Sequence, residues 1–80
     1  MARKSTQYFL AMRARADRAQ IRDEWIEAVI ARPDRTETQD DGRIRKWARI
    51  DAAGGRYLRV VLLEDGETLH NAFFDRGYRP

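Results

Sequence analysis

The chain has 80 residues, of which 16 are basic and 13 acidic, so its formal net charge is +3. This length suits one small domain, since domains run from about 50 to 250 residues. The absence of cysteine excludes disulfides, thiolate metal sites and cysteine nucleophiles, and it is typical of a reducing compartment. Ser5 and His70 are the only residues of their types, so neither a serine–histidine–aspartate triad nor a multi-histidine metal site is expected.

The expected location is the cytoplasm. No apolar stretch approaches the about 20 residues that a membrane span needs, and the first residues lack the apolar segment of a signal peptide. We therefore expect no membrane contact, and also no cofactor and no bound metal ion. Residues 1–4 are expected to form a disordered tail, and residues 5–80 a single domain.

The charges fall into blocks along the chain. Residues 1–22 and 43–59 are strongly basic, residues 23–42 are acidic, and the remainder is mildly acidic. Every basic residue except Lys4 and Lys46 is an arginine, whose planar fork of donors suits phosphates and carboxylates. A GC-rich genome would produce the same arginine bias. Two basic blocks separated by an acidic one predict a molecule with a cationic face.

Two helices are expected before Pro33. Ser5 or Thr6 can cap the first helix, because its side-chain oxygen accepts a free backbone N–H. The apolar positions of this helix include Tyr8, Phe9, Met12, Ala16 and Ala19. The second helix begins near residues 22–23, and its apolar face consists of Trp25, Ile26, Val29 and Ile30. It ends before Pro33, which disfavours helical backbone in the preceding residue.

After Pro33 the pattern is that of strands. Residues 35–39 are predicted to form a short edge strand, which leads into a turn at residues 40–42. Residues 43–51 alternate, with Ile44, Ala48 and Ile50 on one side and Arg43, Arg45, Trp47 and Arg49 on the other. Tyr57–Leu63 is almost continuously apolar, as expected for a central strand. A hairpin turn at residues 64–67 then leads into the last strand, residues 68–75.

This order of elements predicts an α+β fold. Two N-terminal helices are expected to pack on one face of a three- to four-stranded antiparallel sheet. Trp25 and Phe73 are expected in the core, together with the alternate residues Leu58, Val60 and Leu62 of the central strand.

The chain also resembles a known family. Residues 21–29, followed by Arg32-Pro33, resemble the second helix of small bacterial domains of the RelE/ParE toxin superfamily, in a branch near the BrnT-like proteins. Residues 42–47, 55–61 and 71–76 resemble its sheet, so the likeness covers roughly residues 8–78. It implies a bacterial toxin–antitoxin protein that acts on RNA at the ribosome or on another cellular target until an acidic antitoxin neutralises it.

The resemblance also implies a catalytic site. Members place basic residues on the sheet and an arginine and a tyrosine near the C-terminus, and the matching positions here are Arg59, Arg76 and Tyr78. An enzyme of this kind would be a metal-independent endoribonuclease, which needs a group that moves the 2′-OH proton. His70 is the candidate because its ordinary pKa lies near neutrality, unless it is simply a surface side chain. On strict alternation His70 shares a face with Ala72, Phe74 and Arg76, although a β-bulge would break that parity. In an RNA-cleaving enzyme, the sheet face with Arg45, Arg49, Arg59 and His70 is expected to converge with Arg76 and Tyr78.

Five further residues are predicted to bind nucleic acid or a partner, namely Arg43, Arg45, Lys46, Trp47 and Arg49. Phosphates would pair with the cations while a base stacks on Trp47. In the other interpretation Trp47 lies in a core, and the arginines are solvated or paired with the acidic helix. The expected partners are thus RNA, the ribosome or an acidic antitoxin. The alternative function is a non-catalytic protein-interaction module, either a degenerate toxin fold or a ParE-like inhibitor.

Overall fold

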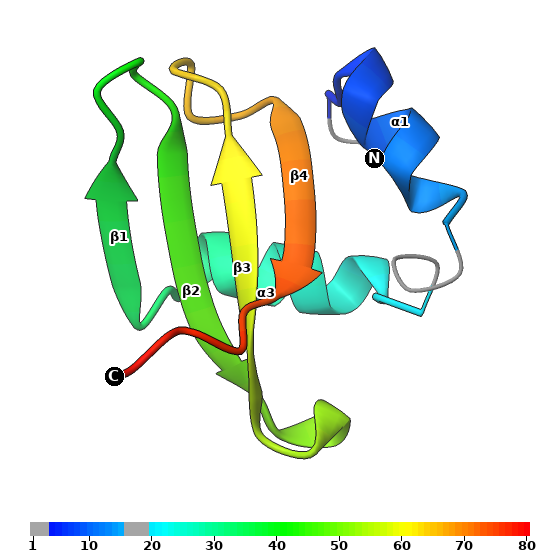
Figure 1. The fold of residues 1–80 in the computed structure, drawn as a ribbon, viewed down its shortest axis with the longest axis vertical. Helices are drawn as coiled ribbons and strands as arrows, with labels where there is room; N and C mark the ends of the chain where they lie inside the picture. Colours follow the sequence, from blue (N-terminus) through cyan, green and yellow to red (C-terminus); the bar gives the residue numbers. More distant parts are fainter. Residues whose placement is uncertain (1–3, 16–19) are drawn as a thin grey trace.

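The computed structural model describes residues 4–15 and 20–80, in which helices precede strands (Figure 1). The elements are α1 (Gln7–Arg13), α3 (Asp23–Ala31), β1 (Arg35–Thr38), β2 (Ile44–Ile50), β3 (Arg56–Leu62) and β4 (Leu69–Phe74). A short 3₁₀ helix at Asp51–Ala53 joins β2 to β3. The predicted α+β fold is confirmed. The expected helical positions Ala16 and Ala19 lie outside the described residues.

The start of α1 and the end of α3 lie where capping and proline chemistry predict, but α1 already ends at Arg13, before the expected Ala16 and Ala19. The hydroxyl of Thr6 accepts the backbone N–H of Phe9 at 3.0 Å, so Thr6 is the N-cap of α1. The carboxylates of Asp23 and Glu24 lie in the first turn of α3, where their negative charge stabilises the helix by interacting with the positive end of its dipole. Pro33 follows the end of α3 closely, as expected.

The four strands form one antiparallel sheet in the order β1-β2-β3-β4. The predicted central strand is confirmed, because β3 lies between β2 and β4. Gly42 and Gly66 occupy the hairpin turns with φ of +90° and +72°, a left-handed backbone that other residues rarely adopt. On the outer side of β4, the carbonyl of Lys4 accepts the N–H of Leu69 at 2.8 Å. Lys4, which was expected in the tail, is therefore bound to the sheet.

One face of the sheet packs against the helices. In Figure 1, α3 runs behind the sheet and α1 lies beside β4. The core between them consists of Phe9, Ile21, Ile26, Val29, Ala48, Ile50, Leu58, Val60, Leu62, Leu69 and Ala72. Lys46 also lies on this side, where its ammonium donates to the carbonyl of Ile30 at 3.4 Å. It is therefore on the opposite face from Arg45, because neighbouring residues of a strand alternate.

Two core expectations need correction. Phe73 is not in this core: it is in register with Arg59 and lies on the opposite face of the sheet. Phe73 and Phe74 are neighbours in β4, so only one can face the helices, and Phe74 does. Trp25 is half-buried at the margin of the core, where its ring meets that of Phe74 at a centroid distance of 6.1 Å.

Candidate nucleic-acid interface

The face of the sheet turned away from α3 is called the open face below. Strand register brings Arg35, Trp47, Arg59 and Phe73 into one row across the four strands. A second, neighbouring row contains Glu37, Arg45, Val61 and Asn71. A third row, which lies on the opposite side of the first, contains the register pair Arg49 and Tyr57. Cations and aromatic rings therefore alternate over this face, and carboxylates of Glu37, Asp51 and Asp75 pair with some of the arginines.

Arg59 lies at the centre of the open face. Its guanidinium carbon is 5.6 Å from the ring centroid of Trp47 and 5.1 Å from that of Phe73. One terminal nitrogen pairs with the carboxylate of Asp75 at 3.7 Å. The buried Nε has no hydrogen-bond partner among the described residues. Burial, followed by the charge of Arg45, lowers the pKa of Arg59. Burial and the nearby positive charge therefore destabilise the charged form of this side chain, and Asp75 offsets only part of the effect.

Trp47 is covered by the 75–80 segment, the residues that follow β4. Only 4% of Trp47 is exposed. Its indole N–H donates to Asp75 at 2.9 Å, and the Tyr78 ring stacks on it with centroids 5.2 Å apart and planes 20° apart. The ring of Tyr57 in turn contacts the ring of Tyr78, with centroids 4.9 Å apart. The ring predicted as a stacking platform is thus occupied by Tyr78, and Trp47 is buried as the other interpretation expected, although not in the core beneath the helices.

The other predicted binding residues differ in their surroundings. Arg43 precedes β2 and pairs with Asp41 of the turn at 3.6 Å. Arg49 is exposed on the open face and pairs with Asp51 at 3.1 Å. Arg45 makes no ion pair with any residue of the described ranges, because Glu37, opposite it in register, pairs with Arg35 of its own strand. The guanidinium of Arg45 donates instead to the side-chain oxygen of Gln39, at 2.9 and 3.1 Å, so its positive charge has a hydrogen-bond partner but no carboxylate among the described residues.

His70 is separated from Arg59 and Tyr78. A bulge between β3 and β4 pairs Val61 with Asn71 but Leu62 with Leu69, so His70 is the extra residue. Its Nδ1 lies 3.1 Å from the Thr6 hydroxyl. Burial, followed by the charge of Arg43, lowers its pKa. His70 is three residues, roughly 10 Å, from the β4 residue that pairs with Arg59.

The ring of His70 also stacks on Tyr8 of α1, with centroids 4.9 Å apart. The side chain thus joins the helix to the sheet edge, and the expected convergence of all four catalytic candidates is not found. Strict alternation would not have brought them together either, because it puts His70 on the face of Ala72 and Phe74, which is the helix side, and Arg59 and Phe73 lie on the other face.

Arg76 and Tyr78 border a shallow hollow beside the open face. Its volume is about 280 Å³, and it lies where β3 begins and β4 ends. Its lining residues are Arg56, Tyr57, Phe74, Asp75, Arg76, Tyr78, Arg79 and Pro80. Sequence reasoning did not include Tyr57 in the site, and it considered Asp75 there only as a possible hydrogen-bond acceptor beside Arg76 and Tyr78. Alternation along β3 could have placed Tyr57 on the face of Arg59, but no local pattern indicates that Asp75 binds Trp47.

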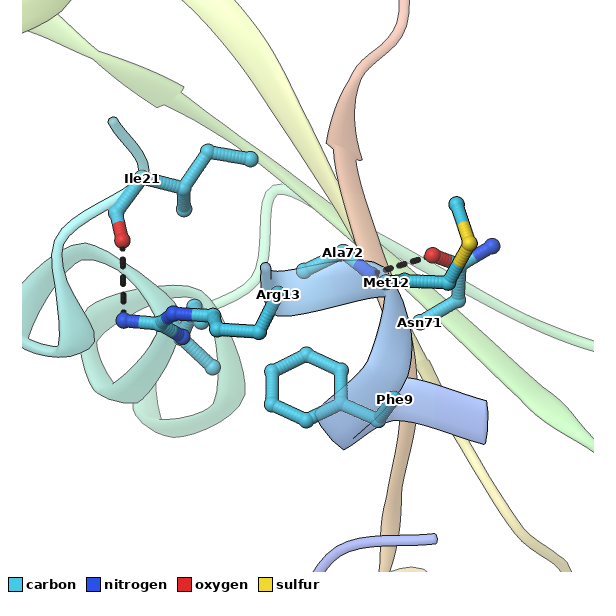
Figure 2. Close-up of a pocket in the computed structure, with 7 residues that line it drawn as sticks. Phe9, Met12, Arg13, Ile21, Asn71 and Ala72 are labelled. Carbon is cyan, nitrogen blue, oxygen red and sulfur yellow. Dashed lines mark hydrogen bonds between the residues drawn. The ribbon is translucent and has the colours of Figure 1, made fainter. Parts of the chain in front are cut away.

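A second cavity lies between α1 and β4 and is shown in Figure 2. Phe9 and Met12 line it, and the guanidinium of Arg13 closes one side by donating to the carbonyl of Ile21 at 3.0 Å. Its volume of about 10 Å³ is close to the smallest that holds one water molecule. This cavity belongs to the packing of α1 and cannot take a larger ligand.

Within residues 4–15 and 20–80, no group of three or more histidine or acidic side chains could hold a metal ion. No helix in these ranges has the length and apolar character to cross a membrane. No protein-family model, curated protein or solved structure matches the chain.

Proposed function

We propose that this domain binds single-stranded RNA through the open face of its sheet. The observation that carries the proposal is the pair Arg45 and Arg59. Arg45 lies two residues along from the register partner of Arg59, and its charge lowers the Arg59 pKa. Like charges this close repel each other, and a phosphate between or above them would offset the repulsion.

The aromatic rings around these cations favour an unpaired strand over a duplex. Tyr57, Phe73 and Tyr78 are each partly exposed beside the guanidiniums. Bases that are not paired can stack on such rings, and arginines can hold the adjoining phosphates. The arrangement agrees with the RNA-directed activity that the resemblance to RelE/ParE toxins implies.

Binding assays on the open face test the proposal. Arg45→Gln should weaken binding to a labelled single-stranded RNA about 3- to 10-fold in fluorescence anisotropy, and should reduce the slope of log affinity against log salt by about 0.7. Arg22→Gln is the matched control, since it removes an equal charge from an exposed residue at the start of α3. Equal losses in both variants would indicate a general charge effect and would reject this face as the site.

RNA cleavage is a second candidate, because Arg59 and Tyr78 both contact Trp47. In this version Arg59 would hold the scissile phosphate and the Tyr78 hydroxyl would move a proton, whereas His70 lies too far along β4 to take part. Primer extension on ribosome-bound mRNA tests it. Tyr78→Phe keeps the ring but removes the hydroxyl, so it should abolish cut sites and preserve RNA binding.

The remaining outcomes separate the function classes. RNA binding without any cut site at high protein concentration would favour a binding module over a nuclease. Failure to bind RNA, combined with capture of an acidic protein that Arg45→Gln weakens, would favour the protein-interaction module instead. The two results cannot be confused, because the first needs only purified protein and RNA.

A further inference from the structure

The outer edge of β1 has an unusual charge pattern. β1 is an edge strand, and no other strand of the described residues pairs with its outer side (Figure 1). Arg35 and Glu37 project from it on the open face, with side chains 53% and 39% exposed. These two side chains form an ion pair within the strand. Thr36 and Thr38 alternate with them.

This edge is complementary in charge to a second copy of itself. An antiparallel partner related by a two-fold axis at Thr36 would place its Glu37 opposite Arg35, and its Arg35 opposite Glu37. Each arginine would then have a glutamate as its neighbour both along the strand and across it. The four charges then lie at the corners of a square with alternating sign, so each charge has an opposite charge as both of its nearest neighbours.

This register applies over β1 itself, Arg35–Thr38, so Arg35 and Glu37 are the charges that decide it. Charges on an edge strand usually prevent pairing with other chains. Here they would reject an edge of different pattern and accept an identical one.

We propose that β1 is a self-association edge, through which two copies join their four-stranded sheets into one continuous antiparallel sheet. The contact is isologous, since the same residues meet on both sides. A strand of four residues buries much less than the about 1,600 Å² of a standard interface. The dimer is therefore weak and concentration-dependent, with a dissociation constant on the order of 10–1,000 µM.

Charge reversal provides the test, by analytical ultracentrifugation over a concentration series without RNA. Arg35→Glu and Glu37→Arg each turn both cross-strand attractions into repulsions, so each alone should weaken dimerisation about tenfold or more. The double variant restores both pairs and should recover the affinity of the wild type. Both side chains are exposed, so circular dichroism should show an unchanged fold.

Mixing the two single variants makes the test specific. The Arg35→Glu chain carries two carboxylates on the edge and the Glu37→Arg chain carries two guanidiniums. An equimolar mixture should therefore form heterodimers more readily than either chain forms homodimers. A wild type that stays monomeric up to about 1 mM would overturn the proposal. A dimer that neither reversal weakens would also overturn it, because its contact would lie elsewhere.

Discussion

Asp75 connects the 75–80 segment to the open face, and its removal should be costly for so small a domain. One carboxylate oxygen accepts the indole N–H of Trp47 at 2.9 Å and pairs with Arg59 at 3.7 Å. The other accepts the backbone N–H of Gly77 at 3.0 Å. The side chains of Asp75 and Arg59 are only 18% and 23% exposed, so solvent replaces these contacts poorly.

The expected loss follows from these contacts. Asp75→Ala leaves the buried Trp47 N–H without its acceptor, which costs about 1–3 kcal/mol. Loss of the partly solvated ion pair with Arg59 adds about 1 kcal/mol. The total of about 2–4 kcal/mol corresponds to a fall in Tm of about 10–25 °C for a domain of this size. Asp75→Asn should lose about half as much, because its amide oxygen can still accept from Trp47, although the hydrogen bond from the Gly77 N–H is lost when the amide nitrogen, a donor, faces it.

Thermal unfolding followed by tryptophan fluorescence measures these changes. Asp51→Ala is the control: Asp51 also pairs with an arginine, Arg49, but its side chain is 88% exposed. Its removal should change the free energy of unfolding by less than about 0.5 kcal/mol. An Asp75→Ala protein within the same limit would refute the argument that Asp75 holds the segment on Trp47.

Three other changes test the packing and the titrating groups. Val60 is fully buried and Trp25 half-buried, so each alanine variant should lose about 2–5 kcal/mol in urea unfolding, with Trp25→Ala at the lower end. Burial lowers the pKa of His70, so its contribution to stability is lost as pH falls below 6.5, and His70→Gln should flatten Tm against pH from about 7.5 to 5. Hydrogen bonds from Thr68 lower the pKa of Asp65 to about 2, so its contribution is lost between pH 3.8 and about 2, and a carboxyl NMR titration should show that midpoint.

Some borders of the elements, such as the start of α1 and the end of α3, were predictable because they depend on neighbours in sequence. Thr6 caps α1 through a contact three residues away, and Pro33 acts on the backbone of the residue before it. Gly42 permits a left-handed turn between β1 and β2 whatever the rest of the molecule does. Such signals are complete within a few residues, so no knowledge of distant packing is needed to interpret them.

The faces of the strands were predictable only where alternation was followed strictly. Alternation placed Arg45 and Arg49 on one face of the sheet and Ile44 on the other face, and the structure has the same arrangement. Lys46 was included with the arginines on the basis of the charge block, although its parity is that of Ile44. Its ammonium instead binds the Ile30 carbonyl at the end of α3, where the negative end of the helix dipole favours a cation.

Whether another segment covers a face of the sheet, by contrast, depends on contacts between residues far apart in the chain. Alternation places Trp47 on the open face, yet a ring there is buried or exposed according to whether another segment reaches it. Tyr78 reaches it because β4 ends beside β3 and Asp75 binds the indole N–H across a separation of 28 residues. The same packing leaves Arg45 without a carboxylate of its own and Arg59 with one. A count of charges could not distinguish these two arginines. A phosphate that binds Arg59 would have to compete with the Asp75 carboxylate, whereas one that binds Arg45 would not.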